Sequence, residues 1–388
     1  MRKVQKLLIQ GVFLAVTVAV LAGCGGKSNI KPPAELKPFT PSAQIATVWS
    51  NGIGSGADGE YLTLAPAISD NVAYTVSFNG RVYATDTKTG NTIWSTKLDA
   101  SLSAIPVVSQ DKVFVGSIYG KLFALDRKTG KEVWKTDLAS SLFSSVAYSK
   151  GKVIAYTHDG TITAYNAETG AQEWTQNVST PSLILVGNST PLVSGDTVFV
   201  GFDNGELWAF NLSSGEKLWD RPVALPSGGS EISRMVDIEA NPVISDGVLY
   251  IATYQGNLVA MNLASGKDVW IKKFSTYTNF SVTSTRLYVT NADGYVMALD
   301  KQTGDTLWKQ KLLEGRSVTG PAVIGDYVAV ADFEGYVHFF DRDSGKYADR
   351  IKVGGDGIRG MPMTNEGELI VQTNSGSLVA LKVRPLTS

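Results

Sequence analysis

The feature of this chain that most restricts its fold is a repeated segment. Seven copies have an x-Gly pair, a short apolar run ending in Asp or Asn, a Thr-Gly or Ser-Gly pair and, in most, a tryptophan four residues later. An eighth copy has only the x-Gly pair and the apolar run. The first glycines are separated by 38 to 51 residues and are Gly80, Gly120, Gly160, Gly205, Gly256, Gly294, Gly335 and Gly376. Repeats of this length indicate one supersecondary unit that is copied and stacked, here eight times.

Each unit is predicted to contain four short β-strands. Around Tyr119-Gly120, for example, the β-branched and aromatic runs 112–117 and 121–125 predict a tight hairpin. The Asp126 to Gly130 turn then leads to a third strand that carries Trp134. A further strand precedes the hairpin and begins after a proline in six units, near Pro66, Pro106, Pro191, Pro242, Pro321 and Pro362.

Eight such units predict an all-β fold, an eight-bladed β-propeller of four-stranded antiparallel blades spanning residues 45–388. A helical solenoid is excluded because the apolar residues alternate with period two. The last unit has no outer strand of its own, and Ile45–Trp49 has the composition of that strand, so we expect it to complete blade eight. The repeat tryptophans are expected to pack between blades, although Asp349 takes this position in the seventh unit.

Composition excludes several classes of function. Lys and Arg number 35 against 36 Asp and Glu, with a pI near 6.2, so no basic field exists to attract nucleic acid. One cysteine permits no intrachain disulfide or cysteine zinc cluster. The two histidines, His158 and His338, are expected at the surface, and no P-loop or nucleophile-elbow motif is present. We therefore predict no catalytic residues, no cofactor and no metal.

The N-terminus carries an export pattern. Arg2, Lys3 and Lys6 precede an apolar run, 7–21, that is too short to be expected to span a membrane. Leu21-Ala22-Gly23-Cys24 is similar to a bacterial lipobox, which implies a signal peptide over residues 1–23 and lipid attachment to Cys24. Gly25 in place of an aspartate favours the outer membrane. Residues 24–44 are predicted to be the lipidated cysteine and a Pro-rich tether; a buried structural cysteine is the alternative.

Two wider repeat spacings predict long loops in neighbouring blades, near residues 175–190 and 220–240. The first contains the apolar run 181–187, and the second contains the charged run 230–239 with Glu231 and Arg234. An apolar segment beside a charged loop is typical of a protein-binding surface with a polar rim. The alternatives are a buried strand for the first segment and a solvated loop for the second.

The segment Ala124–Trp134 has the pattern Ala-x-Asp-x-x-Thr-Gly-x-x-x-Trp, which resembles the tryptophan-docking repeats of pyrroloquinoline-quinone dehydrogenases. Together with the lipobox, the tether and the eight units, the whole chain resembles the propeller lipoproteins of the outer-membrane β-barrel assembly (BAM) machinery. The resemblance implies a non-enzymatic scaffold at the periplasmic face of the outer membrane, monomeric within a hetero-complex. It implies binding to the POTRA domains of a BamA-type barrel subunit and assistance to unfolded barrel precursors, which blade edges can accept as an added strand.

The same family implies which residues meet the barrel subunit, through a Leu-x-Leu-Arg run and an Asp-x-Asp pair. Val186 replaces the arginine and Glu239 replaces the second aspartate, so a salt bridge from that arginine is not expected here. The predicted partner-binding residues are Leu183, Leu185, Val186, Glu231, Arg234, Asp237 and Glu239. The alternative function is a propeller that binds a quinone or another ligand in redox or sensing, but Cys24 cannot supply the adjacent cysteine pair usual in quinone dehydrogenases.

Overall fold

The computed structural model describes residues 32–181, 183–185, 187 and 189–386. The predicted signal peptide, Cys24 and Val186 lie outside these residues. The ring unit begins at Ala34, and its described part consists of β-strands and one 3-10 turn, η1 (Ile232–Arg234). No helix in the described ranges has the length and apolar character needed to cross a bilayer.

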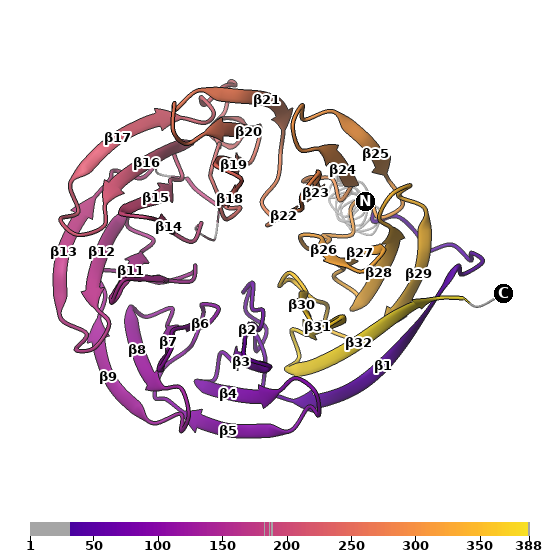
Figure 1. Cartoon of the computed structure of the whole chain (residues 1–388), viewed down its shortest axis with the longest axis horizontal. Helices are drawn as coiled ribbons and strands as arrows, with labels where there is room; N and C mark the ends of the chain where they lie inside the picture. The colour runs from indigo at the N-terminus through magenta and orange to yellow at the C-terminus, as the bar shows by residue number, and fades with distance from the viewer. Residues whose placement is uncertain (1–31, 182, 186, 188, 387–388) are drawn as a thin grey trace, which may run out of the picture. The chain divides into compact units, whose positions relative to one another are not determined.

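The strands form eight four-stranded antiparallel sheets arranged as the blades of a propeller (Figure 1), which confirms the predicted fold. Within each of the first seven blades the chain runs from the inner strand to the outer strand. Blades one to four are β2 (Ala67–Ser69), β3 (Val72–Val76), β4 (Arg81–Asp86) and β5 (Thr92–Lys97); β6 (Val107–Val108), β7 (Lys112–Gly116), β8 (Lys121–Asp126) and β9 (Glu132–Asp137); β10 (Ala147–Ser149), β11 (Lys152–Tyr156), β12 (Thr161–Asn166) and β13 (Gln172–Asn177); β14 (Leu192–Ser194), β15 (Thr197–Gly201), β16 (Glu206–Asn211) and β17 (Lys217–Pro222).

The remaining blades follow the same order until the last, where the outer strand comes from the start of the ring. They are β18 (Val243–Ser245), β19 (Val248–Ala252), β20 (Gly256–Asn262) and β21 (Asp268–Phe274); β22 (Ser281–Val282), β23 (Arg286–Thr290), β24 (Val296–Asp300) and β25 (Thr306–Gln310); β26 (Ala322–Ile324), β27 (Tyr327–Ala331), β28 (Tyr336–Asp341) and β29 (Tyr347–Lys352); β30 (Met363–Asn365), β31 (Glu368–Gln372), β32 (Ser377–Pro385) and β1 (Ala43–Gly52).

In seven of the eight x-Gly hairpins between the second and third strands the glycine has a positive φ; in the fifth, Gln255 takes this conformation instead of Gly256. Gly80 has a φ of +89°, and a Cβ at this position would collide with the carbonyl oxygen of Leu98. The same glycine accepts a hydrogen bond from the Leu98 N–H through its own carbonyl, at 2.8 Å. Only a residue without a side chain fits between the hairpin and the chain that leaves the outer strand. The positive φ also favours glycine, because other L-residues are strained in this conformation.

Tryptophans join neighbouring blades, as predicted. Trp174 pairs with Ala164 in its own blade, and its indole N–H donates to the Leu212 carbonyl of the next blade at 2.9 Å. Its ring lies against Gly215, in the Ser-Gly turn of that blade. Equivalent indole hydrogen bonds link Trp49 to Thr87, Trp94 to Arg127, Trp134 to Ala167, Trp270 to Lys301 and Trp308 to Arg342.

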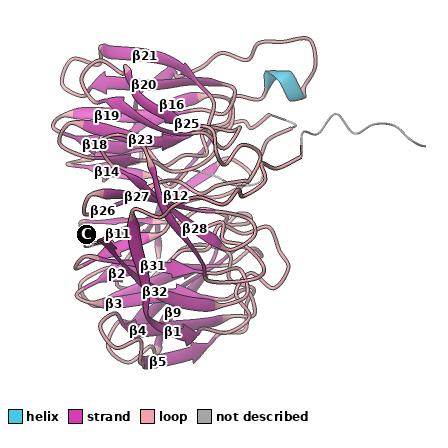
Figure 2. Ribbon diagram, turned by 90° about the vertical axis from the view of Figure 1, so that its right-hand side faces the viewer, coloured by secondary structure: helices cyan, strands magenta, loops and turns pink. Residues whose placement is uncertain are grey.

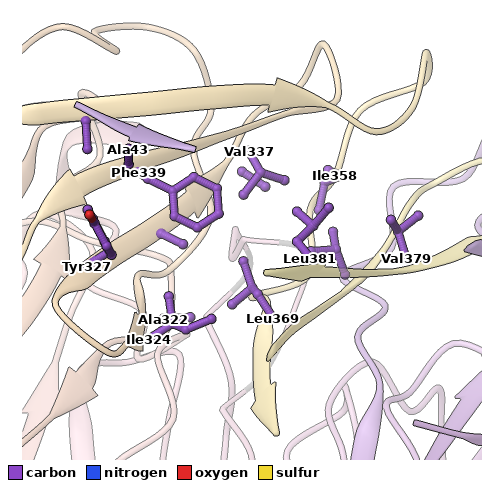
Figure 3. Packing of buried hydrophobic residues seen from close by; sticks show 14 residues of the cluster. Ala43, Ala322, Ile324, Tyr327, Val337, Phe339, Ile358, Leu369, Val379 and Leu381 are labelled. Atoms are coloured by element: carbon purple, nitrogen blue, oxygen red, sulfur yellow. The ribbon is translucent and has the colours of Figure 1, made fainter. Parts of the chain in front are cut away.

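The ring closes where the predicted strand completes blade eight. β1 pairs antiparallel with β32, with Trp49 opposite Ala380, as each docked tryptophan stands opposite an alanine. The indole of Trp49 reaches blade one, donating to the Thr87 carbonyl at 2.8 Å and lying against Gly90. A buried apolar cluster fills the space between blades seven and eight, with Phe339 and Leu381 among its members (Figure 3).

Two tryptophan positions depart from the pattern. Trp219 is 36% exposed, and a Cβ at Gly266 of the next blade would meet open space, so the prediction of packing between blades is wrong for this residue. Asp349 stands opposite Phe339 at the tryptophan position of blade seven. The blade that it faces is the eighth, whose outer strand comes from the other end of the ring, so it has no Thr-Gly turn to receive an indole.

The segment 34–42 lies along the outer strand of blade seven instead. The Ser42 N–H donates to the Ala348 carbonyl at 2.9 Å, and the Phe39 ring meets Tyr347 edge-on with 4.7 Å between the ring centroids. At the start of the segment, the Ala34 N–H donates to the Glu314 carbonyl at 2.8 Å. Part of the predicted tether is therefore bound to the propeller.

His338 is buried, so its predicted surface position is wrong. It lies between Tyr347 and Asp332, and Asp332 also binds the Arg316 guanidinium. Burial alone would raise the pKa of Asp332, but the hydrogen bonds from His338 and Arg316 hold it below its ordinary value. The Asp332 carboxylate and the Tyr347 hydroxyl satisfy both ring nitrogens of His338, and this explains how the imidazole is accommodated in the core. His158 is half-buried against Phe143.

Candidate functional site

The two long loops leave the same face of the ring. The first, 178–191, joins β13 to β14, and the second, 223–242, joins β17 to β18. Each starts beside an x-Gly hairpin, with the Val178 N–H donating to Gly160 and the Val223 N–H donating to Gly205. We call the side of the ring that carries these hairpins the loop face. In Figure 2 the loop with η1 projects from the right-hand side of the ring.

Several side chains on these loops face solvent. Leu183 is 40% exposed and Ile232, in η1, is 67% exposed. Glu231 and Arg234, which flank or end the same turn, are also exposed, as predicted for a charged rim. Leu225 is exposed too. Neither Leu225 nor Ile232 was predicted as a contact residue, because single apolar residues in a polar loop give no periodic signal.

Asp237 and Glu239 point inward. Asp237 is fully buried, and its carboxylate accepts the backbone N–H of Leu185, which is half-buried in the other loop. The Glu239 carboxylate lies against Gly187, where a Cβ would overlap it. The prediction that these two acids belong to an exposed charged loop is therefore wrong. Both point inward, where they join the two loops at their base.

A third carboxylate completes a buried cluster. Asp203, from the hairpin between β15 and β16, lies with Asp237 and Glu239 so that oxygens of all three are within 4.8 Å of one another. Sequence analysis did not group Asp203 with the others, because an aspartate before Asn204-Gly205 is an ordinary turn residue. Carboxylate oxygens are the donors that hard cations such as Ca²⁺ prefer.

Burial controls the charge of this cluster. It raises the pKa of Asp203 to about 7, and the nearby charge of Asp237 adds to the effect, while the hydroxyl of Tyr156 opposes it. Burial also raises the pKa of Asp237 and raises that of Glu239 well above its usual value. Like charges this close in a buried site are not all ionised together, so at neutral pH the cluster holds protons or attracts a cation.

A cavity of about 560 Å³ opens on the loop face, at the axis of the ring. Its wall is made by residues that precede the inner strands of all eight blades and by three hairpins. Aromatic rings, carboxamides and a few charged groups line it, among them Phe143, Tyr254, Tyr277, Asn241, Asn279, Glu239 and Arg359. The cluster of carboxylates thus reaches the cavity through Glu239.

Fold and site together define an eight-bladed propeller of the tryptophan-docking type, with two joined loops and a cavity on one face. The family model described as outer membrane protein assembly factor BamB matches residues 78–310 and 292–385. A curated BamB from Legionella pneumophila (strain Paris) is 41% identical over 380 residues, covering 96% of this chain and 99% of the relative. This chain belongs to the BamB family.

Solved structures agree with this assignment. The crystal structure of BamB from Moraxella catarrhalis is 27% identical, covers 87% of this chain and 100% of that chain, and superposes with a TM-score of 0.80. A quinohemoprotein alcohol dehydrogenase from Comamonas testosteroni covers 89% of this chain and 78% of its own, with a TM-score of 0.68 but 16% identity. The second likeness is one of fold, so it gives no support to a quinone-binding function.

Proposed function

We propose that this chain is a lipid-anchored, non-enzymatic scaffold on the periplasmic side of the outer membrane. In this proposal its loop face docks onto the POTRA domains of a BamA-type subunit, and it assists the folding and insertion of β-barrel proteins. Membership of the BamB family supports the general role. The proposed docking surface is inferred from the two long loops, which are joined at their base and present apolar side chains from one face.

The exposed composition of these loops suits a protein interface. Leu183, Leu225 and Ile232 offer apolar anchors, and Glu231 and Arg234 supply charged groups beside Ile232. Interfaces concentrate binding energy in a few such anchors surrounded by polar groups. Because a rigid ring holds the loop bases, less conformational entropy is lost on docking than with free loops.

The buried acids have a different role in this proposal. Asp237 holds the Leu185 amide, and Glu239 packs against Gly187, so both fix the first loop in place. We therefore assign contact with the partner to Leu183, Leu225, Glu231, Ile232 and Arg234. Leu185 and the acids position that surface.

Co-purification of the BamA-type periplasmic domains with full-length protein tests the docking surface. Leu183→Asp and Ile232→Asp place a charge at an apolar anchor and are expected to weaken binding at least tenfold. Ile93→Asp is the matched control, since Ile93 is 52% exposed on the outer strand β5 of another blade. Equal recovery of the partner by all three variants would remove the loops from the interface.

The lipid anchor has its own test. Cys24→Ser removes the only sulfhydryl in the chain and is expected to release the protein from the outer-membrane fraction into the soluble periplasmic fraction. Retention of this variant in the membrane fraction, in a strain without the barrel subunit partner, would contradict anchoring through Cys24.

A further inference from the structure

The axial cavity combines features that docking of the loops does not use. Its wall includes Glu239, whose buried Oε1 has no hydrogen-bond partner in the described part of the chain. On the side of blade three, the hydroxyl of Ser144 also lines the cavity; this residue is 6% exposed, and its Oγ has no partner among the described residues. Buried polar groups are nearly always paired, so two unpaired ones in one cavity indicate that the cavity is suited to a polar ligand.

The charge of the wall shows what kind of ligand is missing. Among the described residues that line the cavity, Glu239 and Asp356 are acidic and Arg359 alone is basic. Arg359 is already engaged, with its guanidinium 4.5 Å from the Tyr61 ring and donating to the Glu60 carbonyl at 3.0 Å. Oxygens of the buried Asp203 and Asp237 lie within 4.8 Å of Glu239, so a cation at this wall would meet three carboxyl groups. The wall therefore has more acidic than basic groups and is suited to a cationic ligand.

Aromatic rings and carboxamides complete the wall. Tyr254 and Tyr277 lie with 6.4 Å between their ring centroids, and aromatic faces attract ammonium and guanidinium groups. The Oδ1 atoms of Asn241 and Asn279 accept backbone N–H groups of neighbouring loops at 2.8 Å. Their Nδ2 groups have no acceptor among the described residues, so they remain available as donors to carbonyl oxygens.

We infer that the axial cavity binds a lysine or arginine side chain of an extended polypeptide segment, with its cationic group against Glu239 and the tyrosine rings. Carbonyls of the segment accept from Asn241 and Asn279, and the Ser144 hydroxyl gains a partner. A cavity of about 560 Å³ falls within the roughly 300–1,000 Å³ of ligand sites and exceeds the needs of one side chain. The inference rests on the proposed scaffold function and adds a second, axial contact with polypeptide.

Titration calorimetry with two peptides tests this inference on the full-length protein in detergent. The probe is an acetylated, amidated heptapeptide, Thr-Val-Thr-Arg-Thr-Val-Thr, and its control carries citrulline in place of arginine, which keeps the shape and removes the charge. We expect saturable binding of the arginine peptide and at least tenfold weaker binding of the citrulline peptide.

Three variants locate the site. Glu239→Gln should weaken binding of the arginine peptide at least tenfold, and Tyr277→Leu should weaken it severalfold without touching the acid cluster. Glu132→Gln, an exposed acid in β9, is the matched control and should leave binding unchanged. Melting temperatures establish that each variant is folded.

The inference is overturned if the two peptides bind equally, if neither binds, or if both cavity variants bind like the unmodified protein. Its failure is separable from failure of the proposed function, because Leu183→Asp should lose the barrel subunit and keep the peptide. Tyr277→Leu, which lies outside both long loops and the acid cluster, should do the reverse. Loss of the barrel subunit in Leu183→Asp together with absence of peptide binding would therefore refute the cavity alone.

Discussion

Closure of the ring through Trp49 makes a measurable contribution to stability. In Trp49→Ala the indole hydrogen bond to Thr87 is lost, and the ring contact with Gly90 of blade one disappears. A hydrogen bond contributes about 1 kcal/mol net, and replacing a buried tryptophan by alanine costs roughly 3–5 kcal/mol in total. Since Trp49 is half-buried, we expect a loss near the lower end, about 3 kcal/mol.

The chain supplies its own control. Trp219 occupies the equivalent repeat position but is exposed and does not lie against Gly266 of the next blade, so Trp219→Ala should cost about 1 kcal/mol or less. At roughly 2.1 cal/mol/K per residue, a loss of about 3 kcal/mol lowers Tm by about 4 °C in a ring of this size. Differential scanning calorimetry of the two variants measures the difference. Equal shifts for both would refute the argument that docking onto the next blade provides the stabilisation.

Three further outcomes follow from buried groups and from the bound tether. The pKa of Asp203 is raised to about 7, so the contribution of its protonated form to stability is full below about pH 4 and is lost as the pH rises towards 7. The free energy of unfolding of Asp203→Asn, measured by urea titration, should match that of the parent at pH 4 and exceed it by up to about 4 kcal/mol at pH 8. Arg316→Leu leaves Asp332 buried without its guanidinium and should cost about 3–5 kcal/mol by the same measurement. Phe39→Ala removes the ring contact with Tyr347 and should speed cleavage after Glu35 by a glutamate-specific protease while leaving Tm nearly unchanged.

The sequence was sufficient for the ring because turn chemistry and strand alternation repeat eight times. Seven of the eight glycines in x-Gly pairs take a backbone conformation that few residues adopt, and the strand with Trp49 matched the other outer strands in composition. These are local signals, and they add up over the copies. The closing strand was therefore predictable even though its partner lies at the far end of the chain.

The direction in which a loop side chain points was not predictable in the same way. Asp237 and Glu239 look like solvated acids in sequence, and their burial depends on Asp203 and Leu185, which lie in other segments. The same applies to His338. Its burial depends on hydrogen bonds to Asp332 and Tyr347, which the sequence around His338 does not reveal. Such groupings arise only from tertiary structure.

The two tryptophan exceptions differ in whether the structure explains them. Asp349 faces a blade with no Thr-Gly turn, so an indole at this position would have no turn to dock onto. We find no structural reason for the undocked state of Trp219. Its blade is, however, the one followed by the longer of the two long loops.

The pairing of β1 with β32 also dictates an order of events during synthesis and export. A chain that emerges from its N-terminus carries β1 as a lone strand with exposed edges until the last strand arrives, and unpaired edges invite association with other chains. The final blade can form its β1–β32 pair only after all the intervening blades have been synthesised and exported. A chain shortened by the few residues of β32 would therefore remain an open arc, liable to recruit a strand from a neighbour.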